Sequence, residues 1–242
     1  IPLKWGMLSR AVGPFSHAIM FGTCFTIFIP FVWTLRHEKY PWKTVATVFT
    51  VIMIAGALSS MSSNAWMSTI FVVLLLWLGR RKDLAKPLLK FLAVACIAIE
   101  ILSNRRFYHV ILHYANPVSG TWWQRAKLID VGIETIGEWW LAGYKGRDPG
   151  WGPRMGMGHT DTNNEFLLAG VNYGIWGVIA LCIVLGVALY MLVRFHRRTN
   201  DRTLKTWAWA LGVSLVSMII TFQAVSLFGQ NMSLFYLLLG SI

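Results

Sequence analysis

The sequence predicts an all-α fold: a polytopic transmembrane helix bundle with an amphipathic helix in a long extracytoplasmic loop. Hydrophobic residues make up 56% of the 242 residues and charged residues only 13%, against about 25% charged residues in soluble domains. The apolar residues also gather in runs that approach the length of about 20 residues needed to cross a bilayer. We therefore expect a single membrane domain over residues 1–242.

The apolar runs are predicted to be helical spans, separated by basic or polar segments. In chain order, the predicted spans are residues 16–35, 44–61, 65–79, 88–103, 166–193, 207–228 and 232–242. Pro30, near the end of the first span, is compatible with this assignment because membrane helices tolerate proline. The chain begins at Ile1 rather than at a methionine and ends inside an apolar run, which suggests a fragment of a longer protein.

Basic loops give the predicted orientation. Lys and Arg are concentrated in the loops 36–43, 80–90 and 194–205, and short loops of this kind stay on the cytoplasmic side of the membrane. If every span crosses the bilayer, residues 1–15, the turn 62–64 and the interval 104–165 face the opposite side.

Residues 121–142 of the long interval are predicted to form an amphipathic helix. Apolar residues recur there at helical spacing, and we expect Ile129, Ile133 and Ile136 on the buried face. Tryptophan pairs at 122–123 and 139–140 suit a membrane interface, where indole rings prefer to lie. A helix that packs on the spans explains the same pattern equally well.

The formal net charge of +12 is explained by the positive-inside bias of a membrane chain. No basic stripe with RNA-binding motifs is visible, so we expect no nucleic acid partner. The charge can also attract anionic membrane lipid or a phosphorylated lipid carrier. His109 and His113 share a predicted helical face but lack a third ligand. With no other metal-binding motif in the sequence, we expect neither a metal nor a cofactor.

The stretch 151–177 carries the densest set of candidate chemical groups, directly before the apolar run 166–193. These groups are His159, Asp161, Asn163, Asn164 and Glu165. Polar groups at the mouth of a membrane helix are costly to bury unless function needs them. His159 and Asp161 are the predicted catalytic residues, acting as acid or base. An equally supported interpretation is a solvated loop whose Asp and Asn residues cap the following helix.

Arginines on the predicted outer face are candidates for binding a diphosphate. They are Arg10, Arg105, Arg106, Arg125, Arg147 and Arg154. The guanidinium group is planar and permanently charged, and it meets phosphate oxygens in pairs. A surface charge is the simpler interpretation of any single one, but the positive-inside bias does not account for the whole group.

Three stretches resemble segments of the O-antigen ligase/polymerase superfamily of bacterial membrane glycan transferases. SRAVGPFSHAIMFG at 9–22 is similar to the family's Arg-x-x-Gly-Pro-Phe segment, with Arg10 in the arginine position. LSSMSSNAWMS at 58–68 looks like its Ser-Arg-Gly-Ala-Trp turn. WWLAGYKGRDPGWG followed by TNNEFLLAGVNYGIWG looks like the loop that leads into His-Asn-x-x-Leu and Glu-x-Gly. The likeness covers most of the chain but only the C-terminal part of a usual member, which has additional N-terminal spans.

The sequence departs from the family pattern at three polar positions. Ser63 stands in place of the arginine of the turn, Asn163 in place of the histidine, and Asn172 in place of the glutamate, whereas Asn164 and Gly174 match. In the family, these positions are thought to bind lipid diphosphate and activate the acceptor hydroxyl. The resemblance therefore supports the fold more than the activity, and His159 or Asp161 would have to take over the lost role.

The resemblance implies transfer of a glycan from an undecaprenyl-diphosphate carrier to a hydroxyl acceptor, at the outer face of the bacterial inner membrane. Arg10 and Arg125 are expected to hold the diphosphate, with Arg154 as a further substrate-binding residue, and Asn164 to orient the substrate. The alternative is a catalytically inactive accessory subunit that binds other membrane subunits. A transporter is less well supported, because the sequence shows no inverted repeat and no charged residue near a predicted midplane.

Overall fold

The computed structural model describes residues 4–5, 8–37, 41–102, 108–110 and 122–242. It confirms the predicted all-α membrane bundle. Apart from helices, the regular elements among the described residues are two short antiparallel strands, β1 (Lys4–Trp5) and β2 (Leu8–Ser9). Within the described residues, the helices long and apolar enough to cross a membrane are Ala18–His37, Trp42–Ser59, Ile175–Arg198 and Arg202–Phe222.

The chain forms two compact units. Unit 1 comprises Ile1–Lys86, Ala188–Thr221 and Phe228–Ile242, and unit 2 comprises Pro87–Val187 and Phe222–Leu227. The helices that lie wholly in unit 1 are α1 (Ala18–Thr34) with its 3-10 extension η1 (Leu35–His37), α2 (Trp42–Ser59), α3 (Ser63–Leu78) and α11 (Gln230–Gly240). Those wholly in unit 2 are α6 (Trp122–Glu134), α7 (Ile136–Trp139), η2 (Pro153–Met155) and α8 (Glu165–Tyr173). Helices with residues in both units are α4 (Lys82–Leu102), α9 (Ile175–Arg198) and α10 (Arg202–Phe222).

The predicted fifth span, 166–193, is divided in the structure. Its first residues form the separate helix α8, and α9 begins only after Gly174. Gly174 has a φ of +68°, a backbone angle that residues with a Cβ rarely adopt. A Cβ at this position would also lie 2.6 Å from the carbonyl carbon and oxygen of Leu141. Hydrophobicity does not reveal this break, because both α8 before it and α9 after it are apolar.

Another predicted span is a shorter helix than most bilayers require. α3 has 16 residues, against about 20 for a crossing. The described part of the last predicted span is α11, with 11 residues. α4 begins at Lys82, inside the predicted basic loop, so its first turns carry charge. The sequence identified the apolar segments correctly but could not separate complete crossings from short helices.

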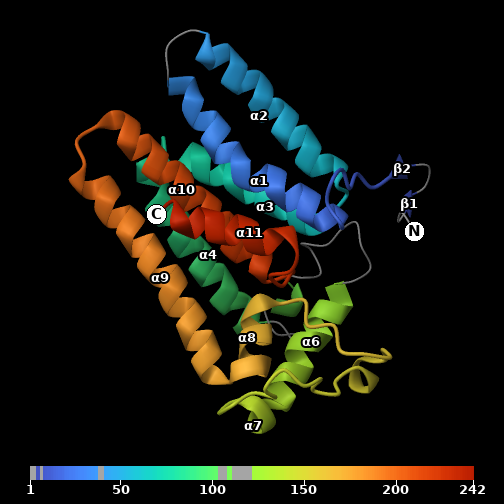
Figure 1. The fold of residues 1–242 in the computed structure, drawn as a ribbon. Helices are drawn as coiled ribbons and strands as arrows, with labels where there is room; N and C mark the ends of the chain where they lie inside the picture. Colours follow the sequence, from blue (N-terminus) through green and yellow to red (C-terminus); the bar gives the residue numbers. More distant parts are fainter. Residues whose placement is uncertain (1–3, 6–7, 38–40, 103–107, 111–121) are drawn as a thin grey trace. The chain divides into compact units, whose positions relative to one another are not determined.

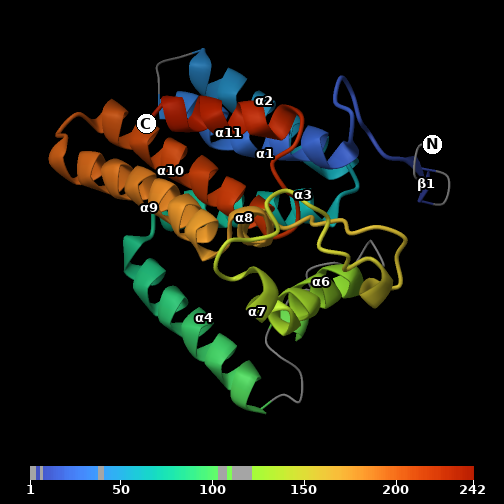
Figure 2. The same ribbon diagram turned by 60° about the horizontal axis from the view of Figure 1, so that its bottom comes forward.

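Small residues and hydroxyl groups hold the helices of unit 1 together. α1 packs against α2, α3 and α11 (Figures 1 and 2). Thr26 and Thr69 join α1 to α3 through hydroxyls 2.9 Å apart, and Ser214 of α10 donates to the carbonyl of Ile27 at 2.8 Å. Such contacts are typical of membrane helices, which gain little from apolar burial against one another.

Gly22 marks the closest approach in this packing. A Cβ at Gly22 would lie 2.5 Å from both the Ala65 Cβ and the Ser60 Oγ. Because neither neighbour is the end of a long, flexible side chain, the helices must move apart to admit a methyl group. Forced overpacking of this kind typically costs about 1–3 kcal/mol.

We therefore expect Gly22→Ala to lower the thermal midpoint of the detergent-solubilised protein by several degrees. The matched control is Gly212→Ala in α10, where a Cβ meets nothing within 4 Å and alanine favours the helix by about 1 kcal/mol. Thermal unfolding followed by circular dichroism measures the midpoints of the two variants. Equal midpoints would contradict close packing of α1 on α3 at this residue.

Candidate functional site

Arg10 lies beside the turn that joins α2 to α3, within unit 1. Its Nε donates a hydrogen bond to the Ser60 carbonyl at 3.1 Å, and the Ala11 amide donates to the Ser59 carbonyl at 3.1 Å. Burial lowers the pKa of Arg10, and burial together with the nearby Arg10 charge lowers the pKa of His17. Arg10 is thus held in place by backbone oxygens, with its charge not paired to a carboxylate in the described residues.

The turn itself is more buried than its polar sequence indicates. Ser60, Ser62, Ser63 and Asn64 are at most 6% exposed, and the Trp66 indole donates to the Leu58 carbonyl at 2.9 Å. Ser63, which stands in the family's arginine position, lies in this enclosed turn. The turn therefore supplies a carbonyl partner for Arg10 and no second guanidinium group.

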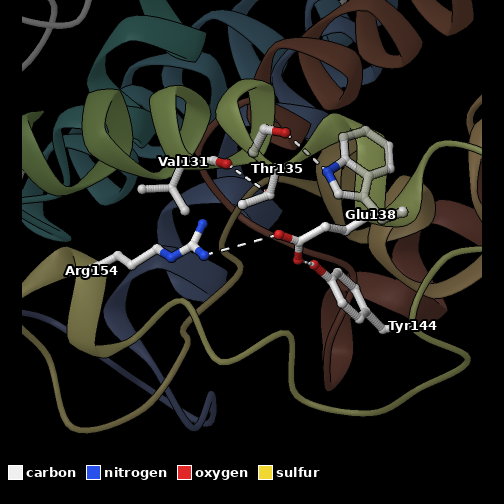
Figure 3. A network of polar contacts seen from close by, with 7 residues as sticks. Val131, Thr135, Glu138, Tyr144 and Arg154 are labelled. Carbon is white, nitrogen blue, oxygen red and sulfur yellow. Dashed lines mark hydrogen bonds and ion pairs between the residues drawn. The ribbon is translucent and has the colours of Figure 1, made fainter.

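The predicted helix 121–142 begins at Trp122 among the described residues and is interrupted at Thr135. The Trp139 indole donates to the Gly132 carbonyl at 2.9 Å, which in a continuous helix would accept from the amide of residue 136. Thr135 bonds back to the Val131 carbonyl through its hydroxyl at 2.7 Å (Figure 3). The indole contact thus takes the Gly132 carbonyl at the point where α6 ends and α7 starts.

The buried face of this helix also differs from the prediction. Ile133 and Ile136 are 42% and 50% exposed. The protein core of unit 2 instead contains Leu128 and Val131, which pack with Trp139, Trp151 and Val171. Ile133 and Ile136 remain exposed and available to lipid, whereas Leu128 and Val131 pack on residues of the loop that follows α7.

Arg154, a predicted substrate-binding residue, has a protein partner. Its guanidinium lies 3.9 Å from a Glu138 carboxylate oxygen, and both side chains are 54% exposed. The other Glu138 oxygen accepts from the Tyr144 hydroxyl at 2.7 Å (Figure 3). Burial, followed by the bond to Glu138, raises the pKa of Tyr144. An exposed ion pair of this kind contributes about 0–1 kcal/mol to stability. Glu138 nevertheless provides a counter-charge for Arg154, so this arginine does not require a substrate anion.

Arg125 is in a different environment. It lies on α6 and is half-buried, and its Nε is enclosed without a hydrogen-bond partner among the described residues. Burial lowers the pKa of Arg125. A polar nitrogen enclosed without a hydrogen bond is costly in a folded protein, so the environment of Arg125 differs from that of Arg154.

His159 and Asp161, the predicted catalytic residues, are exposed in the loop before α8. The residue between them fixes the loop, because the Thr160 hydroxyl accepts from the amides of Trp151 at 2.9 Å and Gly152 at 3.1 Å. Thr160 also lowers the pKa of Asp148, more than the backbone bond from Gly150 does. The exposure of His159 and Asp161 is what the interpretation as a solvated loop predicts.

Asn164 and Glu165 anchor the start of α8. The Asn164 side-chain oxygen caps α8 by accepting from the Leu167 amide at 3.0 Å, and its amide group donates to the Gln223 carbonyl at 3.3 Å. Glu165 accepts from the Leu227 amide at 2.6 Å. Burial raises the pKa of Glu165, against the opposing effect of the Leu227 hydrogen bond. Both side chains therefore connect the segment Phe222–Leu227 to α8. Capping of α8 and the contact with Gln223 account for Asn164 without a substrate.

A cluster around Asp130 did not emerge from the sequence. The His109 Nε2 lies 3.1 Å from the Asp130 carboxylate, which also accepts from the Tyr108 hydroxyl at 2.7 Å. His109 and Asp130 are about a quarter exposed and 21 residues apart in the chain. Their spacing carries no motif, so only the fold brings them together. His113, Arg105 and Arg106 lie outside the described residues.

In the part of the chain that the structure describes, no group of three or more His, Cys, Asp or Glu side chains converges to hold a metal ion. No family model, curated protein or solved structure matches the chain. The resemblance to the O-antigen ligase/polymerase superfamily therefore stays a prediction.

Glu165 provides a test of the anchor at α8. Because its folded-state pKa is raised above the ordinary value of 4.5, the folded protein holds this proton more tightly than the unfolded chain does. The contribution of Glu165 to the free energy of unfolding is therefore largest below pH 4.5 and is lost as the pH rises through the folded value. Glu165→Gln keeps an oxygen acceptor for the Leu227 amide but removes the titration.

We expect the thermal midpoint of Glu165→Gln, relative to wild type, to rise with pH across this window. Unfolding in detergent from pH 4 to pH 7, followed by circular dichroism, measures the difference. Glu134→Gln, at an exposed residue of α6, is the matched control and should keep a constant difference from wild type. A constant difference for Glu165→Gln as well would argue against a buried carboxylate.

Proposed function

We propose that the chain is a membrane glycan transferase of the O-antigen ligase type, which moves a glycan from an undecaprenyl-diphosphate carrier to a hydroxyl acceptor in the bacterial inner membrane. The observation that carries this proposal is the enclosed, unpaired Nε of Arg125. A diphosphate brings about two negative charges, and a guanidinium group meets phosphate oxygens with two parallel hydrogen bonds. A diphosphate at the terminal nitrogens of Arg125 would supply the counter-charge that no ion pair among the described residues provides.

Arg10, described within unit 1 by itself, is the other arginine predicted to hold the diphosphate. Its Nε is bonded to the Ser60 carbonyl, which orients the guanidinium and leaves its terminal nitrogens for a second partner. Within the segment that resembles the family, this residue also occupies the arginine position. Arg154 is the weakest of the predicted substrate-binding residues, because Glu138 already faces its charge.

Two histidines are candidates for the general base. His159 lies between the two stretches that resemble the family and is exposed, as is Asp161. His109 is better oriented, because the Asp130 carboxylate holds Nε2 and so directs Nδ1 the other way. A carboxylate that orients an imidazole favours the tautomer in which the opposite nitrogen accepts a proton. We assign the base to His109, with Asp130 as its positioning residue.

An accessory subunit of a membrane complex is the second candidate. Asn164, one of the family positions that the chain retains, already uses its oxygen for Leu167 and its amide group for Gln223. Ser63, Asn163 and Asn172 stand where the family has arginine, histidine and glutamate. This interpretation predicts stable copurification with other membrane subunits and no transfer.

Glycan transfer from a lipid-linked donor by the full-length protein in proteoliposomes tests the proposal. We expect Arg125→Lys to lower the rate although it keeps the charge, because lysine lacks the planar fork. The control, Lys145→Arg, exchanges the same two residue types at an exposed residue of the same unit and should keep wild-type rates. We expect His109→Gln to lower the rate by about 10²–10⁴-fold, as loss of a general base does.

The alternatives give different results in the same assay. If His159→Ala or Asp161→Ala stops transfer and His109→Gln does not, the base lies in the loop before α8. If wild type transfers nothing and copurifies with a fixed set of membrane proteins, the transferase proposal fails and the accessory role stands.

A further inference from the structure

A basic pocket of about 380 Å³ lies in unit 1, where α1, α9 and α10 have their ends. We define it by the residues Trp33, His37, Arg80, His196, Arg202 and Lys205. Leu76 and Trp209 add apolar surface to its wall. The pocket therefore combines cationic groups with an aromatic and aliphatic lining, and none of its residues takes part in the proposed transferase site.

The cations of this region are packed in a fixed arrangement. The guanidinium carbons of Arg36 and Arg80 lie 3.9 Å and 4.9 Å from the centre of the Trp33 ring. Arginine over an indole face is favourable, but two like charges on one ring repel each other. The Arg36 Nε is also enclosed without a hydrogen-bond partner among the described residues.

Contacts between α3, α9 and α10 shape the wall. A Cβ at Gly79 would lie 2.6 Å from the Trp209 Nε1, so the backbone after α3 lies directly against this indole. The His196 Nδ1 lies 3.0 Å from the Lys205 carbonyl, which joins the last turn of α9 to the first turn of α10. The pocket is thus part of the folded unit, not a gap between loose chain ends.

Among the described residues, no carboxylate forms an ion pair with Arg80, Arg202 or Lys205. Asp201, the acidic residue beside Arg202, uses one oxygen to cap α10 through the amides of Thr203 at 2.7 Å and Leu204 at 3.2 Å. Arg80 and Arg202 are exposed, so their guanidinium groups are accessible to an anionic ligand.

We propose that this pocket binds the phosphate group of an anionic membrane lipid. Helices that can cross a membrane, Ala18–His37, Ile175–Arg198 and Arg202–Phe222, begin or end here. That is the depth at which lipid headgroups lie in a bilayer. The guanidinium groups of Arg80 and Arg202 bind the phosphate oxygens, and the apolar wall accepts the start of an acyl chain. A free phosphate shares the charge but not the apolar contact.

Native mass spectrometry of the full chain in detergent tests the assignment with phosphatidylglycerol, phosphatidylcholine and inorganic phosphate as probes. We expect wild type to retain phosphatidylglycerol over phosphatidylcholine. The pair Arg80→Gln with Arg202→Gln should weaken retention of phosphatidylglycerol by roughly tenfold or more, since each cation near a membrane surface contributes to binding of anionic lipid. The pair Arg80→Lys with Arg202→Lys should recover part of it.

The matched control is Arg194→Gln with Arg198→Gln, which removes the same charge from exposed residues of α9 outside the basic pocket. It should change retention by less than twofold. Equal losses in the two glutamine pairs, or equal retention of both lipids by wild type, would overturn the pocket as a lipid site. Displacement of the lipid by an equal concentration of inorganic phosphate would overturn the assignment to lipid. Partial recovery in the lysine pair excludes misfolding as the cause of the loss.

Discussion

The close approach of α1 to α3 is the constraint on which unit 1 depends. In a bilayer, apolar side chains gain little by leaving lipid for protein, so helices associate through small residues and shared hydrogen bonds. Gly22 lets the α1 backbone reach Ala65 and Ser60. That proximity allows Thr26 to meet Thr69 and brings Ile29 against Val72. The same turn that holds Ser60 also supplies the carbonyl to which Arg10 is bonded, so packing and site geometry share one origin.

The sequence predicted the all-α membrane fold because that fold is encoded in long apolar runs with basic loops between them. It did not predict where those runs break. Gly174 interrupts one run through its backbone angle and through contact with Leu141, and the residues on both sides of it remain apolar. At Thr135 the interruption coincides with the Trp139 indole taking the carbonyl of Gly132, seven residues earlier in the chain. Both breaks involve tertiary contacts, which cannot be predicted from hydrophobic periodicity.

The candidate site was predictable as a list of residue types but not as an arrangement. Arg125 and Arg154 are equivalent in the sequence, yet Glu138 faces only Arg154, and Arg125 lies enclosed on α6. Asn164 was predicted to orient a substrate, and its capping role was the recognised alternative. The contacts with Leu167 and Gln223 favour the cap. His109 pairs with Asp130, 21 residues further along the chain. No local sequence pattern predicts such a pairing, because it depends on how the chain between the two residues folds.

The unequal lengths of the long apolar helices have a consequence for the surrounding lipid. α9 has 24 residues and α2 has 18 residues, which correspond to about 36 Å and about 27 Å at ~1.5 Å per residue. The last turn and a half of α9 carries Arg194, His196, Arg197 and Arg198, so its apolar part, residues 175–193, is about 28 Å long at ~1.5 Å per residue. Both helices therefore fit a hydrocarbon layer of about 30 Å without deforming it. The extra length of α9 should extend beyond the hydrocarbon and place its arginines among the lipid headgroups.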